Sequence, residues 1–199
     1  MKKLHTRGFT IIELLIATVA FSAVLLVITG AIIQFSKIYY KGVVTSKTQE
    51  VARSIADEMS RAAQFSKTKT PVANNPGIVS ATGQAWCFGD KRFNYILGKR
   101  FSTSQPVLNA DTAPAGSCTY NPASSRELVS ENMQLLRLDV TENGDKVSVT
   151  VTVAYGASTD INIDTSNPAN SSCKTIRLGG QYCAISTVTN IVTRRLGSN

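Results

Sequence analysis

The sequence predicts an α+β fold in which one long N-terminal helix packs against an antiparallel β-sheet. Three observations lead to this prediction. An almost uncharged apolar run extends from Phe9 to Phe35, and a one-sided apolar pattern follows it from Lys37 to Ser66. Beyond Pro71 the chain is rich in Gly, Pro, Asn, Ser and Thr with short apolar pieces between them, which is typical of strands and loops.

The apolar run is long enough to cross a membrane. Glu13 is its only charged residue, and a helix needs about 20 residues to cross the roughly 30 Å hydrocarbon core of a bilayer. An ionised carboxylate in hydrocarbon costs about 2.5 to 3.5 kcal/mol, so such a residue usually has a partner or a function. The plain alternative is a shallow Glu13 that reaches the lipid headgroups.

A short basic head, Met1 to Arg7, precedes the run and ends at Gly8. A secretory signal peptide begins in the same way, and Ala20-Phe21-Ser22 would be its cleavage site. We favour a membrane anchor, because Glu13 interrupts the short hydrophobic region that a signal peptide needs. The basic head is then expected to stay cytoplasmic, with everything after Lys37 facing outward.

The residues Arg7-Gly8 and Phe9-Thr10-Ile11-Ile12-Glu13, followed by an apolar helix, resemble the start of type IV prepilins and pseudopilins. The resemblance implies that a prepilin peptidase cuts between Gly8 and Phe9, and that the new amino group of Phe9 is methylated. It also implies that Glu13 helps to add the subunit to a filament. The implied partners are other pilin subunits, the inner-membrane assembly platform and, before assembly, membrane lipid.

Electrostatics gives a reason for that role of Glu13. A carboxylate and an α-amino cation attract each other far more strongly in a low dielectric than in water. Docking beside a neighbour's N-terminus would therefore stabilise the acid. The competing hypothesis is a signal-anchored monomer that never polymerises and still begins at Met1.

Four segments follow from these predictions. Residues 1–8 form a leader, 9–36 a transmembrane and assembly helix, 37–70 the amphipathic second half of that helix, and 71–199 a β-rich periplasmic or extracellular domain. No proline precedes Pro71, so one continuous helix is expected from about Phe9 to Ser66. Its second half carries an apolar stripe at helical spacing, formed by Val44, Val51, Ile55, Met59 and Ala62.

The clearest strand signal is a hairpin from Met133 to Thr141 and from Lys146 to Tyr155, with Asn143-Gly144 as the expected turn centre. Valines alternate with hydroxyl residues in its second strand and are expected to face the helical stripe. Ala184 to Arg195 is expected to form a last strand, and Ala110 to Ser125 a loop held at Cys118. This β-rich domain, with two close cysteines near its end, resembles minor pilins, including those of the W and J types.

The net charge of +8 falls to +5 once Lys2, Lys3 and Arg7 leave with the leader, which is an ordinary surface charge. One segment still suggests single-stranded DNA, because cations alternate with aromatic residues there. Its cations are Lys91, Arg92, Lys99 and Arg100. Some pilus subunits bind DNA during uptake, but we favour a pair of edge strands whose aromatic side chains face the core.

The cysteines Cys87, Cys118, Cys173 and Cys183 all lie in the outward part, where disulfides persist. Of three possible pairings we favour the sequential one. A tight turn at Gly179-Gly180 would place Cys173 opposite Ser186, so the second pair requires a longer loop, and this alternative stays open.

No metal, cofactor or enzymatic activity is expected. The only histidine, His5, lies in the leader, so the commonest general base is absent after processing. Zinc-type cysteine spacing and a phosphate-binding glycine loop are also absent from the sequence. Asp160 and Asp164 could contribute to a calcium site, but they lack the dense acidic ligands of a dedicated loop.

Overall fold

The computed structural model describes residues 10–66, 72–73, 83–101, 106–112, 118–121, 126–157, 159–164, 170–174 and 182–195. The expected cleavage site at Gly8 and Phe9 lies outside these residues, as does the expected turn at Gly179-Gly180. The chain divides into two compact units, Met1–Tyr40 and Lys41–Asn199. The helix α1 (Ile11–Phe65) contributes its first part to one unit and its second part to the other.

In the first unit, the side chains of α1 are exposed throughout, from Ile11 to Tyr40. The helix contains an 18-residue window with a mean hydropathy of 2.7, none of it buried. By length and composition this is a helix that can cross a membrane. The predicted continuous helix is confirmed over the described residues, since α1 ends at Phe65, one residue before the expected end.

The second unit forms its main core on one face of α1. The buried positions are Val44, Thr48, Ala52, Ile55, Ala56, Met59, Ser60 and Ala63. Three residues of the predicted stripe lie on this face, whereas Val51 and Ala62 are half-buried at its margin. The buried face includes Ala52, Ala56 and Ala63. Their small side chains let the helix backbone lie close to the strands.

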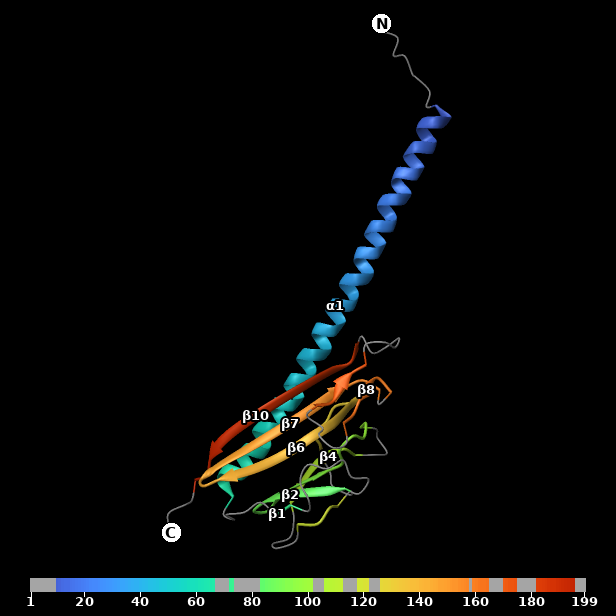
Figure 1. The fold of residues 1–199 in the computed structure, drawn as a ribbon. Coiled ribbons are helices and arrows are strands. Elements are labelled where there is room, and N and C mark those ends of the chain that lie inside the picture. Colours follow the sequence, from blue (N-terminus) through green and yellow to red (C-terminus); the bar gives the residue numbers. More distant parts are fainter. Residues whose placement is uncertain are drawn as a thin grey trace. The chain divides into compact units, whose positions relative to one another are not determined.

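A three-stranded antiparallel sheet packs on this face, in the order β10 (Ala184–Thr193), β7 (Lys146–Tyr155), β6 (Met133–Asn143) (Figure 1). The predicted valine face is confirmed, because the four valines of β7 are at most 1% exposed and share one core cluster with Ile55 and Met59. The predicted last strand is also present, as β10. Hydroxyl groups line the opposite face, where Thr150 and Thr152 pair with threonines of β10.

The predicted hairpin forms, but its turn is shifted by one residue. The ladder between β6 and β7 continues to the pair Asn143 and Lys146, so Gly144 and Asp145 form the two-residue loop. Gly144 has a φ of 62°, whereas Asp145 stays outside the positive-φ region. That combination is the II′ pattern, which needs glycine at the first central position only. A II′ turn therefore favours Gly144-Asp145 as its two central residues, in place of Asn143-Gly144.

A second antiparallel sheet has the order β1 (Val72–Ala73), β2 (Gln84–Phe88), β3 (Lys91–Tyr95), β4 (Leu108–Thr112), β5 (Arg126–Glu127). The expected edge position of the segment from Lys91 is wrong, because β3 lies between β2 and β4. The expected loop from Ala110 is also wrong at its start, since Ala110 to Thr112 belong to β4. The aromatic part of the prediction holds: Phe93 and Tyr95 are buried.

A short two-stranded ribbon, β8 (Ile161–Asn162) and β9 (Ser172–Cys173), accompanies a small separate core. This core contains Leu136, Ala154, Ile161 and Cys183. The register of β6 shifts between Leu135 and Arg137, so Leu136 occupies a bulge. A bulge adds one residue to its strand, and here it lets Leu135 face the main core while Leu136 faces the small one.

Candidate functional site

The first turn of α1 holds the single acidic residue of the apolar run. The amide and the hydroxyl of Thr10 both donate to Oε2 of Glu13, at 3.0 and 2.9 Å. The amide of Glu13 donates back to Oγ1 of Thr10 at 3.4 Å. This reciprocal arrangement is a capping box, which satisfies amide groups that an α-helix leaves unpaired at its start.

This cap was not predicted from the sequence. Its signal was present, because a Thr followed three residues later by Glu, immediately before an apolar run, is the pattern of a capping box. Among the described residues, both bonds that Glu13 accepts from Thr10 end on Oε2, and Oε1 can accept from a further donor.

The hydroxyl groups further along the apolar run are satisfied within the helix. The hydroxyls of Thr18, Ser22, Thr29 and Ser36 each donate to a backbone carbonyl three or four residues earlier, at 2.8 to 2.9 Å. Polar groups in hydrocarbon must find partners inside the protein. These four hydroxyl groups therefore need no water as a hydrogen-bond partner inside a membrane.

Two disulfides stabilise the second unit. Cys87 is joined to Cys118 and Cys173 to Cys183, with Cα atoms 5.9 and 5.7 Å apart. These are the two sequential pairs. The first links β2 to the segment 118–121, and the second links β9 to the residue before β10. Both bonds are consistent with an oxidising compartment.

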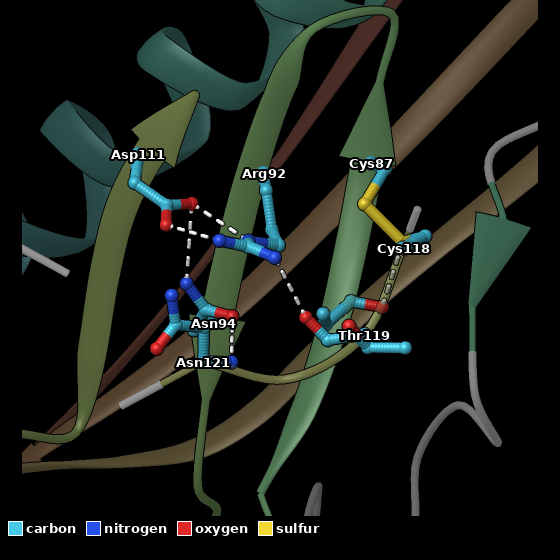
Figure 2. The surroundings of a disulfide bond; sticks show 8 residues. Cys87, Arg92, Asn94, Asp111, Cys118, Thr119 and Asn121 are labelled. Carbon is cyan, nitrogen blue, oxygen red and sulfur yellow. Dashed lines mark hydrogen bonds and ion pairs between the residues drawn. A yellow bond between two sulfur atoms is a disulfide. The ribbon is translucent and has the colours of Figure 1, made fainter. Parts of the chain in front are cut away.

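An ion pair lies beside the first disulfide (Figure 2). Arg92 on β3 donates from Nε to Oδ1 of Asp111 on β4 at 2.8 Å, and from Nη2 to Oδ2 at 2.5 Å. Its Nη1 donates to the carbonyl of Thr119 at 3.0 Å. The Asp111 carboxylate raises the pKa of Arg92 further, so this buried guanidinium stays charged. The pair therefore connects β3, β4 and the segment that carries Cys118.

This geometry corrects the candidate DNA contact at Arg92. The Arg92 side chain is 6% exposed, and its donors are directed to Asp111 and Thr119. Lys91 begins β3, whereas Lys99 and Arg100 follow the opposite end of that strand. Arg92 therefore does not contribute to an exposed cationic patch with the other three cations. Phe93 and Tyr95 are buried and cannot stack on bases.

Glu127 on β5 is a second half-buried carboxylate of the domain. Its oxygens accept hydrogen bonds from the amides of Val107, Leu108 and Val129 at 2.9, 2.8 and 3.2 Å. Burial raises the pKa of Glu127, and the backbone donors offset only part of that rise. The bonds to Val107 and Leu108 fix the entry into β4.

The outward face of α1 in the second unit borders an open groove. Its other walls are the β2–β3 turn, Arg126 and the middle of β10. Both acidic and basic side chains line the groove. Arg126 forms an ion pair with Glu58 at 3.4 Å, and the side-chain amide of Asn190 donates to Asp57 at 2.6 Å. Across the described segments of the chain, no three His, Cys, Asp or Glu residues group as metal ligands.

The chain matches no known protein family, no curated protein and no solved structure. Its class therefore follows from its own features. It is an α+β protein with antiparallel sheets, two disulfides, and one N-terminal helix long and apolar enough to span a membrane.

Proposed function

We propose that this chain is a structural subunit, of the minor pilin kind, of a type IV pilus or a related secretion pseudopilus. In this proposal, prepilin peptidase removes the leader and the subunit polymerises through the first part of α1. The supporting observation is the exposed apolar helix that begins at a single capped carboxylate, Glu13.

The exposed apolar surface is the first argument. Large side chains such as Ile11, Leu26 and Phe35 are 87%, 75% and 70% exposed. A soluble monomer rarely leaves a continuous apolar surface of this extent in water, because burying it is favourable. Lipid covers it before assembly in this proposal, and the helices of neighbouring subunits cover it afterwards.

The position of Glu13 is the second argument. Cleavage after Gly8 would create an α-amino cation on Phe9, four residues before Glu13. Oε2 of Glu13 is held by Thr10, so Oε1 can accept a bond from the amine of a neighbouring copy. Inside a bundle of apolar helices, this charge-assisted bond is stronger than in water. It would fix the axial position of each added subunit.

The domain is the third argument. Its two disulfides suit the periplasm or the cell surface, and the basic head suits a cytoplasmic N-terminus. The subunit would start as a single-pass inner-membrane protein and then enter the filament with help from the assembly platform. DNA binding is not part of this proposal, because Arg92 is buried in an ion pair.

The intact mass and N-terminal sequence of the native protein test the proposal. We expect a chain that starts at N-methyl phenylalanine, Phe9. A Gly8→Leu variant should stay full length, because its side chain prevents the backbone from lying flat in the peptidase. Gly30→Ala is the matched control and should be processed normally, since nothing lies within 4 Å of an added Cβ there. A mature protein that starts at Met1 or after Ser22 would contradict the proposal.

A further inference from the structure

The outer end of the apolar run carries a group of residues suited to the surface of a membrane. We infer that Lys37, Tyr39 and Tyr40 form an interfacial anchor that binds phospholipid headgroups on the outer side of the bilayer. This inference rests on the membrane insertion contained in the proposed function. It adds a defined binding surface and a defined depth for the helix.

The two tyrosines present a broad amphipathic surface. Tyr39 and Tyr40 are 62% and 59% exposed, and their rings meet edge to face, with centroids 6.4 Å apart and planes at 82°. Neighbouring positions on a helix diverge by about 100°, so the pair covers a wide arc. Tyrosine is enriched at membrane interfaces, where its ring lies among apolar chains and its hydroxyl reaches water or phosphate.

Lys37 adds a positive charge on the same side as Tyr40, because residues three apart are neighbours on a helix. Its aliphatic chain can lie along the apolar surface while the ammonium group reaches a phosphate. A phosphodiester accepts hydrogen bonds both from this ammonium and from phenol hydroxyls. The partner that fits this chemistry is the headgroup layer of a phospholipid bilayer.

The length of the helix between Glu13 and this anchor matches a bilayer. The stretch from Leu14 to Ile33 contains 20 residues and no charge, which spans about 30 Å, the thickness of the hydrocarbon core. From Glu13 to Tyr39 the helix rises about 39 Å, close to the roughly 40 to 45 Å of a bilayer with its headgroups. When the tyrosines bind the outer headgroups, Glu13 lies at the inner boundary.

The anchor therefore has a consequence at the other end of the span. It holds the helix at one depth and presents Glu13, together with the expected cleavage site just before it, at the inner membrane surface. The hydroxyls of Thr18, Ser22 and Thr29 do not oppose this placement, since each is bonded to a helix carbonyl. Without the anchor, the apolar helix could slide along the membrane normal.

Depth-dependent fluorescence quenching tests the anchor in the full chain, in phosphatidylcholine vesicles. The native Trp86 is buried in the domain core and is replaced by Phe. Tyr40→Trp then reports the anchor, and Phe21→Trp reports the middle of the span. We expect nitroxide on the lipid headgroup to quench Tyr40→Trp most, and nitroxide deep in the acyl chain to quench Phe21→Trp most.

A second variant tests whether the tyrosines set the depth. In Phe21→Trp, adding Tyr39→Ala and Tyr40→Ala should reduce quenching by the deep label at least twofold and raise quenching by the headgroup label. An unchanged quenching profile when the two tyrosines are replaced overturns the anchor. The anchor is also overturned if the deep label quenches Tyr40→Trp most strongly, or if only an aqueous quencher quenches it. If no lipid label quenches Phe21→Trp, membrane insertion itself fails, and the proposed function fails with it.

Discussion

Thr10 and Glu13 bond to each other in both directions, with two donors of Thr10 on one carboxylate oxygen and the Glu13 amide on the Thr10 hydroxyl. The acid of the apolar run is therefore engaged before any partner arrives. This separates two roles of Glu13, because a neutral Gln can complete the cap but carries no charge for a neighbour's amine. Variants at the two positions can test the roles one at a time.

Replacing Thr10 should loosen the start of α1. Thr10→Val keeps the shape of the side chain but removes the hydroxyl, at an expected cost of about 1 kcal/mol in the first turn. The measurement is amide hydrogen exchange at Ile12 and Glu13, with the full chain in detergent micelles. Thr10→Ser is the control and should keep wild-type protection. Equal protection in Thr10→Val would show that the cap contributes nothing.

Breaking the ion pair of Arg92 should destabilise the domain. The side chains of Arg92 and Asp111 are 6% and 15% exposed, and removing one partner of a buried pair costs about 3 to 5 kcal/mol. Arg92→Met should therefore lower the free energy of unfolding by that amount in urea, followed by Trp86 fluorescence. The double variant Arg92→Met/Asp111→Leu should recover part of the loss. A single variant within about 0.5 kcal/mol of wild type would contradict this.

Glu127 should make the domain less stable as the pH rises above the ordinary carboxyl range. Burial raises the pKa of Glu127 above 4.5 in the folded state, so the folded protein binds the proton more tightly than the unfolded chain does. Its contribution is present below pH 4.5 and is lost as the pH rises through the folded pKa. Glu127→Gln removes the titrating carboxyl group and keeps one acceptor oxygen, which can accept from the amide of Leu108 or from that of Val107 but not from both.

The measurement for Glu127 is the free energy of unfolding of wild type and Glu127→Gln from pH 4 to 7. The difference between the two proteins should change in favour of the variant as the pH rises. Asp145→Asn, at the exposed β6–β7 turn, is the control for the loss of one carboxylate. A difference that does not vary with pH would refute the role assigned to the buried carboxylate.

The two disulfides should differ in their contribution to stability. The cysteines are 31 residues apart in the first pair and 10 in the second. By the entropy of loop closure these bonds are worth about 4 and about 3 kcal/mol. The pair of substitutions Cys87→Ala/Cys118→Ala should therefore destabilise the domain more than Cys173→Ala/Cys183→Ala. Urea unfolding checks the order, and a reducing agent should remove most of the difference from wild type. The reverse order would contradict the loop-length argument.

The sequence was sufficient to predict the long helix, the valine strand and its hairpin, because each depends on a strong local pattern. The turn was placed one residue too early, since Asn143-Gly144 and Gly144-Asp145 both satisfy hairpin chemistry and the choice depends on the register of the whole ladder. The interior position of β3 was also missed. A buried Arg looks like an edge cation until the strand that carries Asp111 is placed beside it.

At the candidate site, the sequence identified Glu13 but not the role of Thr10. A single acid in an apolar run draws attention to its charge, and a hydrogen bond within one turn is less conspicuous. The cations of the segment after β2 were grouped because they are close in sequence. In the structure, Lys91 is the first residue of β3 and Lys99 follows the other end of that strand.

The incorporation of Glu13→Gln into filaments tests the central claim most directly. This variant keeps the capping bonds to Thr10 and removes only the charge that is proposed to attract the amine of a neighbour's Phe9. Cleavage and protein level are measured first, and the fraction of subunit in sheared filaments is then compared with wild type. We expect normal processing and at least about a tenfold loss of incorporation, because a charge-assisted bond becomes a neutral one. Incorporation equal to wild type, with normal cleavage and level, would contradict the account.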